Sequence, residues 1–319
     1  MITVVMYHYV RNLANSRYPS IKGLDFPLFV AQIKYLQKNY SFIRMEDLID
    51  HLYDKKPLPN NPVLLTFDDA YIDHYLNVFP VLDALKIQGS FFAPVKAIAE
   101  HQVLDVNKVH FILASATEDL IINEIKNLLA DIKNESGILS FSEYFETLAF
   151  HSRLDTKEVI FIKRLLQQAL PEKHRNAMVN VLFEKTVGVE ESAFSRELYM
   201  NEWHYKTMLK HGMHIGGHGY DHYWMEKLSP EEQNSEVSKT FGFLKNLGVN
   251  EDYYSYCYPF GSYNDETIKV LKKNSFRCAF TTEVDTIKID KDLNPFVLPR
   301  LDTNDLPKKE NAKTNKWLI

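Results

Sequence analysis

Two adjacent aspartates, Asp68 and Asp69, follow an apolar run in the stretch LLTFDDAYIDH at residues 64–74. Adjacent carboxylates repel each other, and both lose hydration when they lie at the edge of a packed core. A positive charge beside them would offset both costs. The pair therefore predicts a bound cation or a basic side chain at this point of the fold.

Two histidines, His218 and His222, lie four residues apart in the stretch HIGGHGYDH at residues 214–222. Two imidazoles and one carboxylate form a common ligand set for a catalytic metal ion. Neither pattern is specific by itself, because the chain has 12 histidines and paired aspartates are frequent on solvated turns. Together they are more specific, since each follows a predicted buried strand, where β/α sheets collect their chemistry. A cation held by Asp69, His218 and His222 would also offset the repulsion of the aspartate pair.

The elements that must position these residues alternate between strands and helices. Short β-branched or aromatic runs predict strands at 2–7, 62–67, 89–95, 213–217, 253–260, 277–282 and 295–300. Helical spacing of apolar residues predicts helices at 25–39, 75–87, 229–248 and 265–274. The helix at 229–248 has the clearest ends, with a capping box of Ser229 and Glu232, Pro230 at its first position and Gly248 at its end. This alternation predicts an α/β fold with a parallel sheet, closed into a distorted (β/α) barrel.

The middle of the chain has a different pattern. Residues 101–200 contain no convincing strand, and helical periodicity recurs at 117–134, 141–150, 156–170 and 172–188. We therefore predict a discontinuous barrel domain over 1–100 and 201–319 that carries a helical insertion over 101–200. Two interpretations of the insertion stay open: a lid or substrate platform, and a packing or oligomerisation module.

Composition limits the classes of partner. The 319 residues carry a net charge of −5, which gives no general attraction to nucleic acid or to anionic membranes. The only two cysteines, Cys257 and Cys278, do not make a disulfide framework. No window approaches the ~20 apolar residues of a membrane span, and the first residues do not resemble a signal peptide. We expect a cytoplasmic protein without a membrane span, and the sequence does not indicate its oligomeric state.

Three motifs together resemble a known family. TFDDAY at 66–71, GGHGYDH at 216–222 and CYPFGSYN at 257–264 resemble, in this order, the polysaccharide deacetylase family, also called the NodB homology domain or carbohydrate esterase family 4. The resemblance covers residues 1–100 and 200–300. It implies a distorted β/α barrel that binds a divalent metal ion, usually zinc, through one aspartate and two histidines.

The resemblance also implies roles for individual residues. Asp68 corresponds to the general base, and Asp69, His218 and His222 correspond to the metal ligands. The backbone N–H of Phe260 corresponds to the donor of the oxyanion hole. The neighbouring positions Tyr258 and Pro259, together with Tyr71, are implied substrate-binding residues.

The sequence departs from the family pattern at three places. Gly219 stands where the family usually has serine or threonine, and Cys257 stands where it often has an arginine that pairs with the base. Arg300 in the stretch LPRLD is a candidate replacement for that arginine, with a surface salt bridge as the competing interpretation. The family's late histidine, a general acid, is also missing, because no histidine follows His222.

His8 is the candidate for the missing acid. It lies in MYHYV, which is similar to the N-terminal strand of family members related to exopolysaccharide deacetylases. An imidazole just past a strand end can protonate a departing amine near neutral pH. A core or loop histidine without a chemical role is the competing interpretation.

These features predict a metal-dependent hydrolase that removes an N-acetyl group from an amino sugar, acting on a carbon–nitrogen bond of a linear amide. We expect the substrate to be a nucleotide- or lipid-linked intermediate in the biosynthesis of a cell-surface polysaccharide, such as capsule or lipopolysaccharide. Two alternatives stay open. One is a deacylase or amidase that acts on a non-sugar amide or ester, and the other is a catalytically inactive carbohydrate-binding relative.

Overall fold

A computed structural model describes residues 1–152, 155–313 and 315–317. The chain divides into two compact units. The first, here called the barrel unit, comprises Met1–Asn12, Gly23–Gln102 and Ser195–Ile319. The second, here called the helical unit, comprises Leu13–Lys22 and Val103–Phe194.

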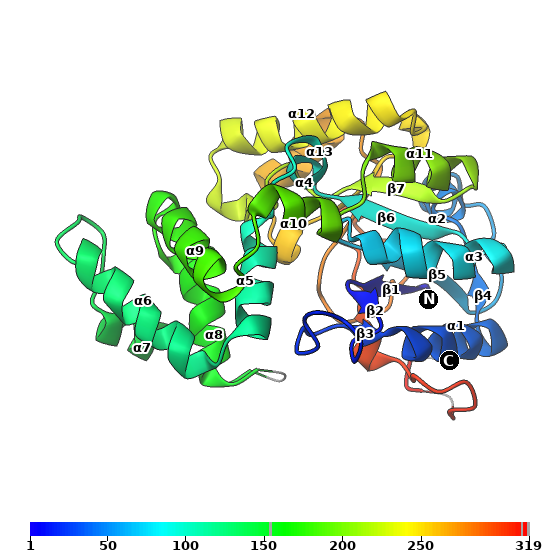
Figure 1. Cartoon of the computed structure of the whole chain (residues 1–319). Coiled ribbons are helices and arrows are strands. Elements are labelled where there is room, and N and C mark those ends of the chain that lie inside the picture. The colour runs from blue at the N-terminus through cyan, green and yellow to red at the C-terminus, as the bar shows by residue number, and fades with distance from the viewer. Residues whose placement is uncertain (153–154, 314, 318–319) are drawn as a thin grey trace. The chain divides into compact units, whose positions relative to one another are not determined.

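The barrel unit is built around a curved parallel sheet (Figure 1). Its strands run in the order β10 (Leu301–Asp302), β1 (Thr3–Tyr7), β5 (Pro62–Phe67), β6 (Gly89–Ala93), β7 (His214–Gly217), β8 (Ser255–Cys257) and β9 (Cys278–Phe280). The short β4 (Ser41–Phe42) pairs with β5, and β2 (Val10–Arg11) with β3 (Leu24–Asp25) forms a separate parallel pair. Leu298 bridges Phe280 of β9 while Leu301 pairs with Val5 of β1, which brings the two edges together. The predicted distorted (β/α) barrel is confirmed.

The strand predicted at 295–300 is wrong in its bounds, because β10 is only Leu301–Asp302. Pro295 and Pro299 have no backbone N–H to donate to a ladder, so the segment before β10 pairs only at isolated points. One of these points is the Leu298 N–H, which donates to the Ala279 carbonyl at 3.0 Å. Arg300 therefore precedes the last strand and does not end it.

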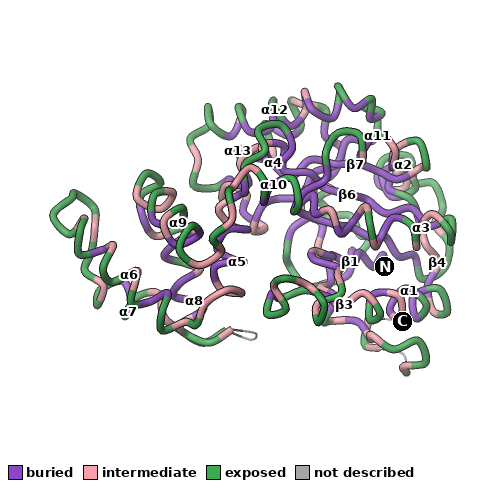
Figure 2. The backbone as a smooth tube through the Cα atoms, in the orientation of Figure 1, coloured by how far each residue is buried: buried purple, intermediate pink, exposed green. Residues whose placement is uncertain are grey.

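Helices surround this sheet. In the barrel unit they are α1 (Phe26–Asn39), α2 (Met45–Asp54), the π-helix η1 (His74–Val78), α3 (Phe79–Leu85), α4 (Val95–Ala99), α11 (Glu202–Lys210), α12 (Pro230–Leu247) and α13 (Asp265–Lys273). Four 3-10 turns complete it: η3 (Met225–Lys227), η4 (Glu251–Tyr253), η5 (Pro259–Gly261) and η6 (Thr303–Asp305). The strands they cover are buried along their length, as the continuous purple of β5, β6 and β7 shows (Figure 2).

The helix predicted at 229–248 has the expected ends. The Ser229 hydroxyl accepts a hydrogen bond from the Glu232 N–H at 3.3 Å, and the Glu232 carboxylate accepts one from the Ser229 N–H at 2.8 Å. Gly248 follows α12 with φ of 82°, a left-handed conformation that glycine adopts without strain. The capping box and the C-terminal glycine therefore fix both ends of α12.

The helical unit has no strand among its described residues. It consists of α5 (Asp105–Ser115), α6 (Glu118–Ile132), α7 (Phe141–Leu148), α8 (Lys157–Arg164), the π-helix η2 (Leu165–Ala169) and α9 (Glu172–Thr186), and α10 (Glu191–Leu198) leads out of it. Aromatic rings pack against one another in it: the buried ring of Phe161 lies 5.4 Å from Phe141 and 5.0 Å from Phe145, centroid to centroid. The segment 13–22 belongs to this unit because Tyr18 packs edge-on against Phe111 at 5.0 Å.

Candidate metal centre and active site

The register of the sheet brings several strand ends to one level. Tyr7 of β1 pairs with Phe67 of β5, and Ala93 of β6 pairs with Gly217 of β7. Each ladder continues for one more residue, because Asp68 N–H donates to the Tyr7 carbonyl and His218 N–H to the Ala93 carbonyl, both at 3.0 Å. The aspartate pair and the first histidine therefore project from the same edge of the sheet.

Asp69, His218 and His222 converge at this edge. The Nε2 atoms of His218 and His222 each lie 3.3 Å from Asp69 Oδ1. One ligand atom from each of the three residues lies within 4.8 Å of the others, a spacing that could hold a metal ion. All three side chains are buried. The structure thus brings together the three residues that the sequence predicts as ligands.

The donor set itself fits a cation. His218 Nδ1 lies 2.8 Å from the Cys257 carbonyl, so this nitrogen carries the proton that it donates. When the His218 ring is neutral, its Nε2 lone pair faces Asp69 Oδ1, which is buried and has no hydrogen-bond donor among the described residues. Two lone pairs at this distance repel each other unless a proton or a metal ion lies between them. The three residues therefore fit a divalent metal ion.

The carboxylates and imidazoles of the centre shift one another's pKa values. Burial would raise the pKa of Asp69, but the two imidazoles outweigh it and hold that pKa well below its ordinary value. Although burial lowers the pKa of His218, the carboxylates of Asp69 and Asp68 raise it above its ordinary value. Tyr71 donates its hydroxyl to Asp69 Oδ2 at 2.6 Å, which leaves Oδ1 turned toward the histidines.

Several residues at the centre have a strained backbone. Asp69, Ala70, His222 and Phe260 all have positive φ, between 57° and 75°, although none is glycine. Such left-handed conformations cost free energy in residues with a Cβ and persist where the surroundings impose them. Here they turn Asp69 and His222 toward a common point.

Asp68 is held differently from its neighbour. Arg300 binds it through two parallel contacts, with Nη1 to Oδ1 at 3.0 Å and Nη2 to Oδ2 at 2.7 Å. Arg300 also donates from Nε to the Thr281 carbonyl at 2.9 Å and is only 1% exposed, so this contact is no surface salt bridge. Burial would raise the pKa of Asp68, but the arginine outweighs it and lowers that pKa. Asp68 is therefore an ionised carboxylate beside the three-residue cluster.

His8 follows β1 and is half-buried. Its side chain lies close enough to Asp68 and Asp69 to affect their pKa values. The His8 carbonyl lies 2.9 Å from Nε2 of His74, and burial lowers the pKa of His74 to about 4, so a neutral His74 donates this hydrogen bond. His74 thus holds the backbone of His8 at the strand end.

The turn after β8 supplies an aromatic wall. Phe260 stacks on Trp224 with ring centroids 4.6 Å apart and contacts the His222 ring edge-on at 4.7 Å. Tyr258 is buried and donates its hydroxyl to the Phe296 carbonyl at 3.0 Å. Pro259 is buried as well, as is Tyr71. Substrate binding by Tyr71, Tyr258 and Pro259 stays a prediction, and both phenol groups already have protein acceptors.

Several contacts at the centre were not predicted. The carbonyl of Cys257 orients His218, and Glu236 of α12 binds the backbone between the two histidines. Every residue has a backbone carbonyl, so the type of a residue does not indicate what its carbonyl binds. Glu236 lies on a helix whose polar residues are expected from the sequence to be solvent-exposed. The position of Trp224, two residues after His222, did indicate that its ring could lie near the centre.

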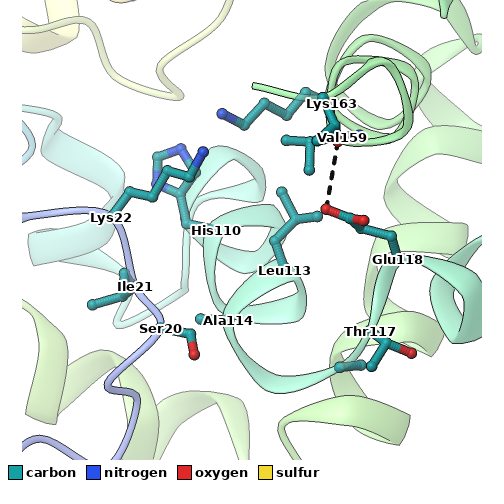
Figure 3. Close-up of a pocket in the computed structure, with 12 residues that line it drawn as sticks. Ser20, Ile21, Lys22, His110, Leu113, Ala114, Thr117, Glu118, Val159 and Lys163 are labelled. Atoms are coloured by element: carbon teal, nitrogen blue, oxygen red, sulfur yellow. Dashed lines mark hydrogen bonds between the residues drawn. The ribbon is translucent and has the colours of Figure 1, made fainter. Parts of the chain in front are cut away.

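The helical unit contains a pocket of its own, with a volume of about 390 Å³ (Figure 3). Ile21, Leu113 and Val159 line its apolar part, while Lys22, Lys163 and His110 bring nitrogen atoms to it. Both lysines pair with Asp155, whose single carboxylate offsets part of their charge. None of the predicted site residues lines this pocket.

Parts of the chain are similar in sequence to known proteins. A sequence profile described as polysaccharide deacetylase matches residues 170–279, which include both histidines of the centre and the turn after β8. The resemblance to the polysaccharide deacetylase family is confirmed. YxkH of Bacillus subtilis (strain 168), named "Putative polysaccharide deacetylase YxkH", is 32% identical over 85 residues. This match spans 27% of the present chain and 30% of YxkH.

Solved structures resemble the whole chain. IcaB from Ammonifex degensii has a TM-score of 0.56 at 20% identity, covering 95% of this chain and 92% of that one. The Streptococcus pyogenes deacetylase PplD, described in complex with acetate, has a TM-score of 0.55 at 16% identity, covering 94% and 91%. At these identities the likeness establishes the polysaccharide deacetylase fold. Among the residues that the structure describes, no helix is long and apolar enough to cross a membrane.

Proposed function

We propose that this protein is a metal-dependent deacetylase that removes the N-acetyl group from an amino sugar. The observation that carries the proposal is the convergence of Asp69, His218 and His222 beside a separate ionised aspartate, Asp68. A purely structural metal site has no use for a second, unliganded carboxylate. The family match and the likeness to deacetylase structures support the same reaction.

Asp69, His218 and His222 would hold the ion, which by the family resemblance is usually zinc. When bound, a divalent ion supplies a Lewis acid that polarises the amide carbonyl and increases the acidity of water. The protein contributes three ligands, a number that leaves room for water and substrate. Tyr71 keeps Asp69 Oδ1 available for this purpose by occupying Oδ2.

Asp68 acts as the general base in this proposal. Arg300 keeps it ionised and fixes its orientation, so it can take a proton from the attacking water. Arg300 acts through Asp68 and is a positioning residue. The water adds to the carbonyl carbon, the carbon–nitrogen bond breaks, and acetate and a free amine leave.

His8 and Phe260 have the remaining roles. His8 is half-buried beside the carboxylates, a place from which an imidazole can give the departing nitrogen its proton. The backbone N–H of Phe260 is proposed as the donor to the developing oxyanion. The left-handed φ of 57° at Phe260 is a local strain of the kind that accompanies such roles.

Assays of acetate release test the proposal. The purified protein, loaded with zinc, is incubated with N-acetylated amino sugars and their oligomers, with simple acetamides and with acetate esters. Release from the sugars supports the proposal. Release only from the non-sugar compounds would support a deacylase or amidase, and no release from any of them would support an inactive carbohydrate-binding relative.

The proposal also covers the class of the substrate and the cellular location of the enzyme. We propose a cytoplasmic enzyme that acts on a nucleotide- or lipid-linked amino sugar of cell-surface polysaccharide biosynthesis. Cell fractionation combined with assays on nucleotide-linked and lipid-linked substrates tests both. Protein found outside the cell, with activity only on finished polymers, would contradict this part of the proposal.

A further inference from the structure

The loop between the two histidines is bound by one buried carboxylate. The backbone N–H groups of Tyr220 and Asp221 both donate to Oε2 of Glu236, at 2.8 and 3.0 Å. Glu236 lies on α12 and is only 5% exposed. A single oxygen of a distant helix thus accepts two consecutive amides of the segment that joins His218 to His222.

Gly219 leaves room for this carboxylate. A Cβ at Gly219 would lie 3.1 Å from Glu236 Oε2 and 3.4 Å from Cγ of Pro259. The residue also has φ of 74°, which side chains rarely tolerate. The position of the Glu236 carboxylate therefore depends on glycine at residue 219, because a side chain there would crowd it.

The carbonyl side of the same loop is bound by α4. The Val95 N–H donates to the Gly219 carbonyl at 3.2 Å, and the Lys96 N–H donates to the Tyr220 carbonyl at 3.0 Å. Lys96 also pairs with the Asp221 carboxylate. The loop is thereby held from two sides, its carbonyls by the start of α4 and its amides by Glu236.

We propose that Glu236 is a positioning residue that fixes the loop 219–221 and so holds His218 and His222 at the separation that metal binding needs. The inference rests on the metal centre of the proposed function. His222 is strained, with φ of 60°, so the segment that precedes it must be fixed by contacts outside the loop.

The burial of Glu236 is costly, which favours a functional reason for it. Burial raises the pKa of Glu236 to about 7, against the two amides that lower it. Asp221 raises this pKa further, and Lys239 lowers it. A glutamine would satisfy the same two amides without any charge, so Glu236→Gln separates hydrogen bonding from charge.

The test measures zinc affinity by competition with a chromophoric chelator, in protein freed of metal. Residues that orient a ligand from behind it typically contribute 10–100-fold to metal affinity, so we expect Glu236→Ala to raise the zinc Kd by that factor. Glu236→Gln should recover most of the loss, because its carbonyl oxygen can accept both amides. Gln233→Ala is the matched control: Gln233 is buried on the same helix but bonds to Leu228 and Thr267.

Far-UV circular dichroism and urea unfolding accompany each titration, so that a folding defect is recognised as such. Wild-type zinc affinity in folded Glu236→Ala would overturn the assignment, and so would an equal loss in Gln233→Ala. A wild-type protein that binds no zinc would contradict the proposed function itself, and this assignment with it. The two failures are therefore distinguishable.

Discussion

Asp68 and Asp69 are neighbours in sequence but face different partners. Arg300 occupies both oxygens of Asp68, whereas Tyr71 occupies one oxygen of Asp69 and the histidines face the other. The left-handed φ of 75° at Asp69 makes this divergence possible, because it turns the second side chain away from the first. The arrangement gives one carboxylate to the metal and keeps the other free of it.

Asp68→Asn tests this division of roles. The asparagine keeps the shape but cannot accept a proton, so the rate of acetate release should fall by ~10²–10⁴, the usual contribution of a general base. Metal content should stay at the wild-type level, because Asp68 is not among the three ligands. Rate assays and elemental analysis of the same preparation measure both. A variant that retains the full rate would contradict the assignment of Asp68 as the base.

Arg300→Met tests the buried pair through stability. Removing the guanidinium leaves Asp68 as an unpaired buried charge, which typically lowers the free energy of unfolding by ~3–5 kcal/mol. Urea unfolding measures the loss. The double variant Arg300→Met with Asp68→Asn is the control, and we expect it to be more stable than Arg300→Met because the lone charge is gone. Equal loss in both variants would show that the arginine stabilises by packing alone.

At the level of single residues, the sequence alone predicted most members of the observed cluster. The aspartate pair and His218 could be placed at one edge of a parallel sheet because each directly follows an apolar strand. His222 could be added from its spacing of four residues to His218, and the family resemblance distinguishes Asp69 as the ligand from Asp68 as the base. Arg300 could be named as a partner for Asp68 but not placed, since its contact spans 232 residues of sequence. The Cys257 carbonyl and Glu236 could not be found, because backbone contacts and helix orientation depend on tertiary packing.

At the scale of elements, the glycines of β7 set how closely other elements approach it. A Cβ at Gly216 would lie 2.4 Å from the Phe92 ring, and a Cβ at Gly217 would lie 2.4 Å from Thr240 of α12. Contacts this short cannot exist without displacement of a neighbour. The strand that precedes His218, β7, therefore approaches Phe92 of β6 and Thr240 of α12 as closely as only glycine permits.

Gly216→Ala should lower the free energy of unfolding by about 1–3 kcal/mol, the usual cost of overpacking a core. The matched control is Gly242→Ala on α12, where a Cβ would meet nothing within 4 Å. There the change should raise the free energy of unfolding by about 0.5–1 kcal/mol, because alanine loses less backbone freedom in a helix. Urea unfolding compares the two variants, and a stabilising Gly216→Ala would contradict the close approach of Phe92.

Element prediction succeeded where the local signal was strong. β5 occupies the predicted residues 62–67, and α12 has both predicted caps. The helices α2, α4, α5, α10 and α11 were missed, and the last strand was misplaced. The N-cap residue of α2 is Arg44, which is none of the usual Ser, Thr, Asp or Asn. The strand error arose because Pro295 and Pro299 interrupt an apolar run.

At the scale of the whole molecule, buried histidines link stability to pH. Burial lowers the pKa of His214 to about 4, opposed by the carboxylate of Glu46 and assisted by Arg44. The Ser255 hydroxyl lies 2.7 Å from His214 Nε2 and gives the neutral ring a partner. Folding therefore holds His214 in its neutral form over a pH range in which the unfolded chain binds a proton.

This linkage predicts acid sensitivity with a definite sign. Below the ordinary histidine pKa of ~6.5 the unfolded state binds more protons than the folded state, so stability falls as pH decreases. His214 should contribute a loss of roughly 3 kcal/mol between pH ~6.5 and ~4. Urea unfolding at several pH values measures the slope, and His214→Gln should make it shallower. An unchanged slope in the variant would exclude His214 as its source.

The central claim is that one divalent ion is bound by Asp69, His218 and His222. Its most direct test is the zinc stoichiometry of purified, metal-free protein after reloading and gel filtration, measured by elemental analysis for the wild type, His222→Ala and Asp68→Asn. The account predicts one ion per chain in the wild type and in Asp68→Asn, and little or none in His222→Ala. A wild type that takes up no divalent ion, or a His222→Ala variant that keeps a full equivalent, would contradict it.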